Sequence, residues 1–449
     1  MTTTAPGGVT TPAMADRTLL HAWNPEDEEL WAAGGRRIAR RNLAFSIVSE
    51  HIGFSVWSLW SVLVLFLGPA YHVDAAGKFL LTSVPTLVGS VLRLPYSFAV
   101  TRFGGRNWTM FSALILLVPC GLAAFMVKPG VSYSTLLVLA AITGVGGGNF
   151  ASSMTNINAF YPDRLKGWAL GLNAGGGNIG VAAVQLVGLG VLAWSGKGHP
   201  GLVAGIYLPL IVLAAAGSAI YMDNLPNRTP ERGAIREVAK YGHTWIISVL
   251  YIGTFGSFIG FGFAFGQVLQ VQFKHDFATP IDAAYLTFLG PLLGSLSRPI
   301  GGRLADRFGG ARVSLVTFGV MAAGAAIVLA ASGAKSLPVF VAGFVLLFIF
   351  SGVGNGSVYK MIPVLFAAEP EAKSRRLSGA LIGLAGAVGA FGGVLVNLAF
   401  RQSFLSTKSG DSAYLGFLIF YGLCAALTWV AYLRPSAVAS EAEAVPAAG

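Results

Sequence analysis

Two arginines lie in the middle of long apolar segments, and the sequence around them occurs twice. Arg93 ends a GSVLR segment and is followed nine residues later by Arg102 in RFGG, while Arg298 ends GSLSR and is followed nine residues later by Arg307 in RFGG. A guanidinium inside a bilayer is costly unless it faces a cavity or a partner, so each arginine indicates a functional site. Because they occupy equivalent places in two repeats, we predict one central site that holds an anion.

The composition of the chain is typical of a protein that crosses the membrane many times. Of its 449 residues, 54% are hydrophobic and only 11% are charged, whereas about a quarter of the residues in a soluble domain are charged. The 59 glycines fit helices that pack closely in lipid. We therefore predict an all-α membrane protein of twelve transmembrane helices. The twelve apolar stretches lie near residues 42–68, 77–100, 107–127, 133–160, 168–194, 201–221, 244–273, 281–302, 312–331, 337–366, 377–400 and 412–433.

The net charge of +11 does not require a nucleic-acid partner, because the basic residues are placed as in a membrane protein. With both termini inside the cell, most of them fall in cytoplasmic segments, with clusters at 36–41, 228–240 and 373–376. This is the positive-inside pattern, which sets the orientation of helices in the bilayer. We expect cytoplasmic termini, contact with the lipid bilayer and no binding of nucleic acid.

A polar interval from Tyr221 to His243 divides the predicted helices into six and six. The arginine repeat and a second repeat, GVGGG at 144–148 and GVGNG at 352–356, indicate a duplication. Parallel six-helix halves resemble the major facilitator superfamily, whose substrate site lies between the halves near the membrane midplane. The predicted parts are a tail at 1–41, a bundle at 42–221, a cytoplasmic loop at 222–243, a bundle at 244–433 and a tail at 434–449.

Two short loops resemble a further motif of the superfamily. LADRFGGAR at 304–312 has the aspartate of that motif, Asp306, whereas the first copy has Thr101 in its place. Such loops make gating contacts between helices, so the predicted gating residues are Arg102, Asp306 and Arg307.

The segment GGGNFASSM at 146–154 and the segment GVGNGS at 352–357 resemble the two signature motifs of the nitrate/nitrite porter family. The resemblance extends over residues 42–433, and it implies a bacterial inner-membrane transporter of nitrate and nitrite. Glycine-rich faces that only pack helices are the alternative interpretation. The resemblance, together with the need of buried polar groups for partners, gives these predicted substrate-binding residues: Arg93, Arg298, Asn178, Phe150, Tyr251, Phe255, Phe54, Asn173 and Ser357.

The two arginines suit nitrate for a chemical reason. Nitrate is planar and singly charged, and a guanidinium donates two parallel N–H bonds to such a group and keeps its charge. In the alternative interpretation each arginine pairs with a buried carboxylate. Glu50 is the one acidic residue well inside a predicted span, so it cannot neutralise Arg93, Arg298 and Lys360 together.

Import of an anion needs a driving force, because an inside-negative potential opposes it by about 2.3 kcal/mol per charge per 100 mV. The force can come from proton symport or from exchange for an internal anion such as nitrite. EHIGFSVW at 50–57 resembles the nitrate/proton symport branch of the family, so we predict that Glu50 and Lys360 carry the coupling proton. The alternative is a static ion pair between these two residues.

Other functional classes fit the sequence less well. There is no metal-ligand cluster, no nucleophile paired with a base and no phosphate loop with its lysine, so we expect neither an enzyme nor a cofactor. A small-anion channel could also use arginines at mid-membrane, but the six-plus-six repeat favours a carrier. The expected ligands are nitrate, nitrite and protons, and we expect a monomer to be functional.

Overall fold

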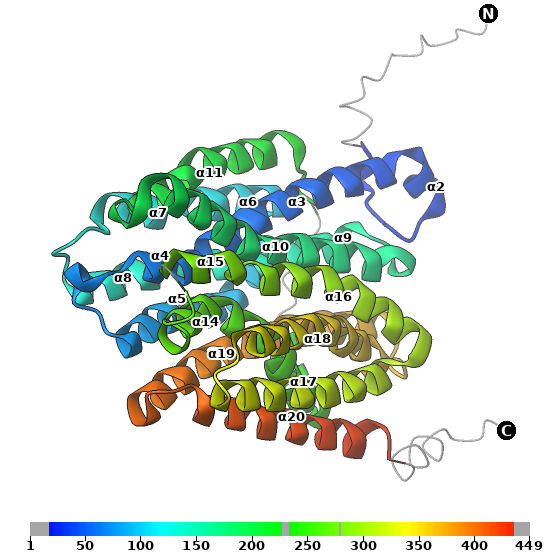
Figure 1. Ribbon diagram of the computed structural model, residues 1–449. Helices are drawn as coiled ribbons and strands as arrows, with labels where there is room; N and C mark the ends of the chain where they lie inside the picture. Colours follow the sequence, from blue (N-terminus) through cyan, green and yellow to red (C-terminus); the bar gives the residue numbers. More distant parts are fainter. Residues whose placement is uncertain (1–17, 227–232, 278–279, 435–449) are drawn as a thin grey trace, which may run out of the picture.

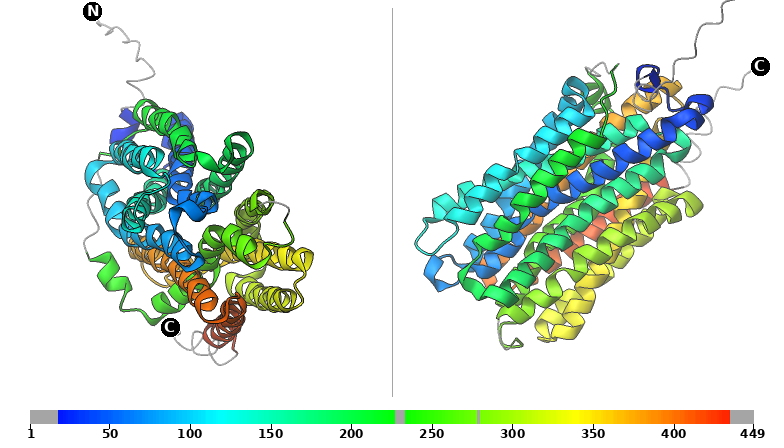
Figure 2. Two further views of the ribbon diagram at one scale, coloured as in Figure 1. Left: turned by 60° about the vertical axis from the view of Figure 1, so that its left-hand side comes forward. Right: turned by 90° about the horizontal axis from the view of Figure 1, so that it is seen from above.

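The structure is a computed structural model that describes residues 18–226, 233–277 and 280–434. All regular elements in these ranges are helices, and most run along one common direction (Figures 1 and 2). The first half contains α2 (Glu28–Leu30), α3 (Arg36–Trp57), α4 (Leu59–Phe66), α5 (Ala75–Phe103), α6 (Gly105–Leu114), α7 (Leu117–Met126), α8 (Tyr133–Thr143), α9 (Asn149–Phe160), α10 (Asp163–Ser195) and α11 (Gly201–Tyr221).

The second half begins after the central loop. It contains α12 (Ala234–Val238), α13 (Gly242–Tyr251), α14 (Ser257–Gln272), α15 (Pro280–Thr287), α16 (Leu289–Phe308), α17 (Gly310–Gly333), α18 (Leu337–Leu365), α19 (Glu371–Thr407) and α20 (Asp411–Tyr432). Short turns of other helix types, η3 (Gly144–Gly148) and η5 (Ile252–Gly256), join α8 to α9 and α13 to α14.

Eleven helical segments of the described ranges are long and apolar enough to cross a membrane. The twelfth predicted span, near 281–302, is formed by α15 and α16, which are separated at Phe288. Its apolar character is weak because α16 carries Arg298 and, toward its end, Arg303, Asp306 and Arg307. With this pair counted as one crossing, the twelve-helix fold predicted from the sequence is confirmed.

Several helices begin before the apolar stretches that predicted them. α3 starts at Arg36, α10 at Asp163 and α19 at Glu371, each five or six residues earlier than expected. Hydrophobicity marks the part of a helix that lies in lipid, whereas the backbone hydrogen bonds continue into the polar region. The predicted N-terminal tail and central loop are therefore partly helical; residues 1–17, 227–232 and 435–449 lie outside the described residues.

The two RFGG repeats turn the chain in the same way. Gly104 has φ 86° and ψ 151°, and Gly309 has φ 88° and ψ 137°, a region of backbone conformation that favours glycine. The next glycine in each copy packs closely on a neighbouring helix: a side chain at Gly105 would collide with Asn156 of α9, and one at Gly310 with Met361 of α18. The repeats thus preserve equivalent helix junctions.

The helices of the two halves form two groups that meet along a long interface (Figure 2). α5 of the first half packs against α19, and α10 packs against α16 of the second half. Both described ends of the chain lie at one end of the bundle, at the right of Figure 1. We call this end, where α3, α10 and α19 begin, the terminal face, and the opposite end the far face. The helices that carry the repeated arginines, α5 and α16, both border the interface.

Candidate functional site

The two repeated arginines lie beside one pair of aromatic rings. Arg93 of α5 and Arg298 of α16 are buried, with exposed fractions of 0% and 3%. The guanidinium carbon of Arg93 lies 4.4 Å from the ring centre of Phe150 and 4.8 Å from that of Phe255. The corresponding distances for Arg298 are 5.7 Å and 5.9 Å. Because Phe150 and Phe255 come from different halves, the structure brings both arginines to one place at the interface.

Each arginine uses only part of its hydrogen-bonding capacity. Arg93 donates from Nη1 to the carbonyl oxygen of Gly386 in α19 at 2.9 Å, and Arg298 donates from Nη2 to the Tyr251 hydroxyl at 3.0 Å. Within the described ranges, Nε and Nη2 of Arg93 and Nη1 of Arg298 have no hydrogen-bond partner. Buried charged donors without acceptors are costly, so these N–H groups are suited to an anion that enters the site.

An aromatic wall surrounds the arginines. The ring of Phe255 stacks on Tyr251 at 5.2 Å and on Phe150 at 5.7 Å. Phe54 of α3 packs edge-on against Phe150 at 6.0 Å and against Trp57 at 5.3 Å. All four aromatic residues expected at the site from the sequence, Phe54, Phe150, Tyr251 and Phe255, therefore belong to one cluster.

Glu50 is buried on α3 between α9 and α10. Its Oε2 accepts a hydrogen bond from Asn173 Nδ2 at 2.7 Å and another from the Ser153 hydroxyl. Its Oε1 faces Gly177, where any side chain would collide with it, and has no hydrogen-bond partner among the described residues. The amide of Asn173, which was predicted to bind substrate, is thus engaged through Nδ2, whereas its Oδ1 has no hydrogen-bond partner among the described residues.

Lys360 does not meet Glu50. Its ammonium group forms an ion pair with the Asp306 carboxylate at 2.6 Å, and its side chain is 36% exposed. The ion-pair alternative for Glu50 and Lys360 is thus wrong, since Lys360 reaches out toward α16 near the terminal face. Arg102 and Arg307 are exposed and lie over the rings of the phenylalanines that follow them, so only Asp306 of the predicted gating residues joins two helices here.

Two other predicted polar residues have different surroundings. Asn178 of α10 is fully buried, and neither atom of its amide has a hydrogen-bond partner within the part of the chain that the structure describes. It therefore keeps both a donor and an acceptor for a ligand. The hydroxyl of Ser357, also predicted to bind substrate, shares a hydrogen bond of 2.8 Å with Ser314 and so joins α18 to α17 inside the second half.

Comparisons with known proteins agree with this architecture. The family model of the Major Facilitator Superfamily matches residues 45–397. The nitrate/nitrite transporter NarU of Salmonella typhimurium is 36% identical over 453 residues, which cover 93% of this chain and 97% of that protein. The probable nitrate/nitrite antiporter NarK2 of Thermus thermophilus is 33% identical over 447 residues, covering 94% and 98%.

The chain belongs to the nitrate/nitrite porter family of the major facilitator superfamily. Solved structures show the same fold at low sequence identity. A D-xylose–proton symporter superposes with a TM-score of 0.68 at 16% identity, over 87% of this chain and 97% of that one. The xylose transporter XylE of E. coli, in a partially occluded inward open conformation, gives a TM-score of 0.66 at 14% identity, over 89% and 98%.

A cavity of about 450 Å³ connects the porter's arginine cluster with the terminal face. Arg93, Phe150 and Gly386 line its deep end, and Lys166 and Arg375 line its mouth. Arg298 does not line this cavity, although it shares the rings of Phe150 and Phe255 with Arg93. An anion that comes from the terminal face therefore reaches Arg93 first.

The two halves are in close contact toward the far face. Thr82 of α5 donates to the Asn397 side chain of α19 at 2.8 Å, and Phe79 stacks on Phe400 at 5.7 Å. Trp57 of the first half also packs against Phe263 of the second at 5.6 Å. The porter is thus open to the terminal face and closed beyond the arginines.

Two aromatic residues of the porter site were missed in the sequence. The Arg298 guanidinium lies 5.4 Å from the ring centre of Tyr359, which stacks on Tyr251 at 4.3 Å. The Arg93 guanidinium lies 5.4 Å from the ring centre of Trp57. Trp57 had no signal in the sequence that could have found it, because the packing of its indole on Gly89 of the repeated motif is evident only in the structure. Tyr359 had none, since a tyrosine in an apolar helix more often only packs.

Proposed function

We propose that this chain imports nitrate, and also accepts nitrite, by alternating access driven by proton symport. One observation carries the proposal: two buried guanidiniums from opposite halves share a pair of rings and keep N–H groups that have no acceptor among the described residues. The relatives named nitrate/nitrite transporters support the choice of ligand. A carrier also accounts for a cavity that reaches Arg93 from the terminal face.

The arginines clamp the anion in complementary ways. The unpartnered atoms of Arg93, Nε and Nη2, form one edge of its guanidinium and match two oxygens of a planar nitrate. From the other half, Nη1 of Arg298 is available, and the Tyr251 hydroxyl orients this guanidinium by accepting from its Nη2. The Asn178 amide can donate to the third oxygen. Phe150 and Phe255 keep water away from the clamp.

The distribution of charge sets the direction of transport. Clusters of arginine at the start of α3 and of lysine and arginine at the start of α19 lie on the terminal face. By the positive-inside rule we assign this face to the cytoplasm of a bacterial cell, so the cavity is the inward-facing state of the carrier.

The coupling proton must be carried by the protein, because nitrate stays ionised at physiological pH. Glu50 is suited to this because it is buried, its Oε1 has no hydrogen-bond partner within the described ranges, and its charge interacts with both Arg93 and Arg298. Binding or loss of a proton at Glu50 would therefore change the field at the anion. Lys360 has no part in this revised proposal, since it is paired with Asp306.

Exchange of nitrate for nitrite is the second candidate. It is favoured by the relative from Thermus thermophilus that is named a probable nitrate/nitrite antiporter. In that case Glu50 would only orient α9 and α10 through Ser153 and Asn173, with no change of protonation during the cycle.

Proteoliposomes with a clamped membrane potential distinguish the two candidates. For symport we expect nitrate to enter vesicles that contain no nitrite. Protons should enter with it and acidify the vesicle interior, as reported by an internal pH-sensitive dye. Uptake that requires internal nitrite and moves no protons would establish exchange instead. Uptake that does not saturate and shows no counterflow would favour a channel.

A further inference from the structure

The carboxyl group of Glu50 lies one layer of side chains away from the cavity. Met154 of α9 and Leu170 of α10 line the cavity. Glu50, Ser153 and Asn173, which we call the Glu50 network, are not among the described residues that line it. Met154 also contacts this network, since its Sδ lies 3.6 Å from Nδ2 of Asn173. The side chain of Met154 therefore separates the Glu50 network from the space that opens to the terminal face.

Two buried oxygens of the Glu50 network are suited to a water molecule. Oε1 of Glu50 and Oδ1 of Asn173 have no hydrogen-bond partner among the described residues. Both lie on one face of α10, because Oε1 is next to Gly177, one turn after Asn173. The Ser153 hydroxyl, which is bonded to Glu50 and to Asn173, adds a third polar group. Since a buried water typically makes about three hydrogen bonds, the network can hold one that enters from the cavity.

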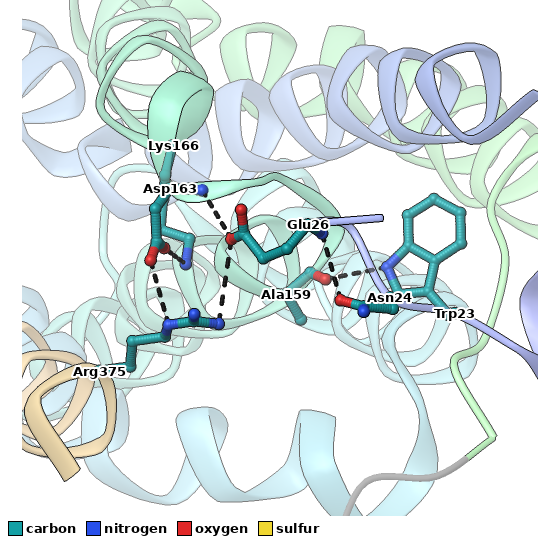
Figure 3. A network of polar contacts seen from close by, with 7 residues as sticks. All are labelled: Trp23, Asn24, Glu26, Ala159, Asp163, Lys166 and Arg375. Atoms are coloured by element: carbon teal, nitrogen blue, oxygen red, sulfur yellow. Dashed lines mark hydrogen bonds and ion pairs between the residues drawn. The ribbon is translucent and has the colours of Figure 1, made fainter. Parts of the chain in front are cut away.

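Water can reach Met154 because the mouth of the cavity is charged. Lys166 and Arg375 line the mouth, where they pair with Asp163 at 2.5 Å and 3.0 Å (Figure 3). Exposed ion pairs of this kind remain in contact with water. The same cavity extends inward to Met154 and Arg93. A proton released beside Met154 therefore has an aqueous route to the terminal face.

Methionine is suited to a barrier that opens for short times. Its thioether is a weak acceptor with no proton of its own, so it cannot relay one. Its unbranched side chain has three rotatable bonds and can swing aside. Met154 also lies one turn after Phe150 on α9, and the ring of Phe150 is shared by Arg93 and Arg298. Because both residues lie on the same face of the helix, a movement of Phe150 at the anion site can reach Met154.

We propose that Met154 is the barrier on the path by which Glu50 releases its proton to the cavity. When Met154 swings aside, a water molecule enters the Glu50 network. The O–H bond of the carboxyl group breaks, and its proton forms a new O–H bond on that water, which passes it to the water of the cavity. The carboxylate that remains accepts from Ser153 and Asn173, as it does in this structure.

The charged groups around Glu50 favour release of the proton. The carboxylate interacts with Arg93 and Arg298, and positive charge stabilises the ionised form. The adjacent His51 is directed elsewhere, since its Nδ1 lies 3.2 Å from the carbonyl oxygen of Gly176. The role of Met154 in transport rests on Glu50 as the proton carrier of the proposed function, whereas the access of water to Glu50 does not.

Access to Glu50 can be measured without transport. A small water-soluble carbodiimide adds to a protonated carboxyl group, an added amine converts the product to a stable amide, and mass spectrometry locates it. In nitrate-free nanodiscs, Met154→Ala should be labelled at Glu50 about tenfold faster than the parent, as for a barrier lowered by about 1.4 kcal/mol. The matched control Ile382→Ala shortens a side chain of the cavity wall formed by α19 and should be labelled at the parental rate.

Two outcomes of the labelling would overturn the proposal. Equal rates in Met154→Ala and the parent would show that Met154 does not limit access to Glu50. Equal acceleration in Ile382→Ala would show that any widening of the cavity exposes Glu50. Neither outcome bears on whether the chain transports nitrate.

Met154→Leu tests the role of the barrier in the transport cycle. Leucine fills a similar volume, but its branched side chain has one rotatable bond fewer and swings aside less easily. Net nitrate uptake, which requires Glu50 to release its proton in each cycle, should be severalfold slower. Exchange of labelled nitrate at equal concentrations on both sides, during which the proton can stay bound, should keep the parental rate.

Equal slowing of net uptake and exchange in Met154→Leu would indicate a structural role only, and no slowing of either would also contradict the proposal. Net uptake by the parent without proton entry would instead refute the proposed symport. The labelling rates at Glu50 would be unaffected by that result, so the two failures are distinguishable.

Discussion

The surroundings of Arg93 and Arg298 differ although their sequences repeat. Arg93 bonds to a backbone carbonyl of the opposite half, at Gly386, and lines the cavity. Arg298 bonds to a tyrosine of its own half, Tyr251, and does not line the cavity. The duplication fixes where each guanidinium projects from its helix, whereas residues outside the repeat decide what each one meets.

This difference separates the tasks of the two arginines. In the proposed clamp, an anion from the terminal face meets Arg93 first and can accept from its Nε and Nη2 while Nη1 stays bonded to the Gly386 carbonyl of the other half. Arg298 is already oriented by Tyr251 and by the ring of Tyr359, so it can complete the clamp once the rings of Phe150 and Phe255 move. We infer that capture depends on Arg93 and closure on Arg298.

The largest expected effect comes from replacing either arginine by lysine. Arg93→Lys or Arg298→Lys keeps a charge but loses paired N–H bonds, so nitrate should bind about ten- to a hundredfold more weakly in each. Isothermal titration measures the Kd. The same change at the exposed repeat residues, Arg102→Lys and Arg307→Lys, is the matched control and should leave the Kd unchanged. Wild-type affinity in Arg93→Lys would contradict the proposed role of Arg93 in capturing the anion.

Glu50 is the one acidic residue well inside a predicted span, and it belongs to the first half. Glu50→Gln therefore tests whether this difference between the halves serves proton coupling. Glutamine can accept the bonds from Ser153 and Asn173 but cannot carry the proton. We expect nitrate counterflow to persist and proton entry with nitrate to be lost, as measured with an internal pH dye. Unchanged proton entry would exclude Glu50 as the carrier of the proton.

Tyr251→Phe removes the hydroxyl that orients Arg298 and keeps the stacked ring. Loss of one hydrogen bond to a charged group should weaken nitrate binding about tenfold. Titration of nitrate into Tyr251→Phe and into the unrelated buried variant Tyr421→Phe separates this effect from a general loss of packing. Equal Kd values in Tyr251→Phe and the parent would mean that Arg298 does not need the hydrogen bond to Tyr251 in order to bind nitrate.

The smallest effect is expected for Tyr359→Phe. Its hydroxyl makes a long hydrogen bond of 3.3 Å to the carbonyl oxygen of Ile382, while the ring that faces Arg298 is kept. The KM for nitrate uptake should change about twofold or less, and Tyr359→Ala should raise it further by removing the ring. A larger effect of the hydroxyl than of the ring would reverse this assignment.

Much of the fold followed from the sequence because apolar length and repeated motifs are local properties. The arginine repeat and the signature motifs placed Arg93, Arg298 and the rings correctly at one interface. The partner of Lys360 did not follow, since an apolar run does not show how close to its end a lysine lies or that Asp306 of another helix is within reach. The hydrogen-bond partners of Asn173 and Ser357 did not follow either, because helical spacing gives the face on which a residue lies but not the neighbour on that face.

A double-mutant cycle on nitrate affinity tests the clamp most directly. Arg93→Lys, Arg298→Lys and the double variant are compared with the parent by titration. If both guanidiniums hold one anion, the losses should be strongly non-additive, and the double variant should bind little worse than either single variant. Losses that add, as for two independent sites, would contradict the shared clamp between the halves.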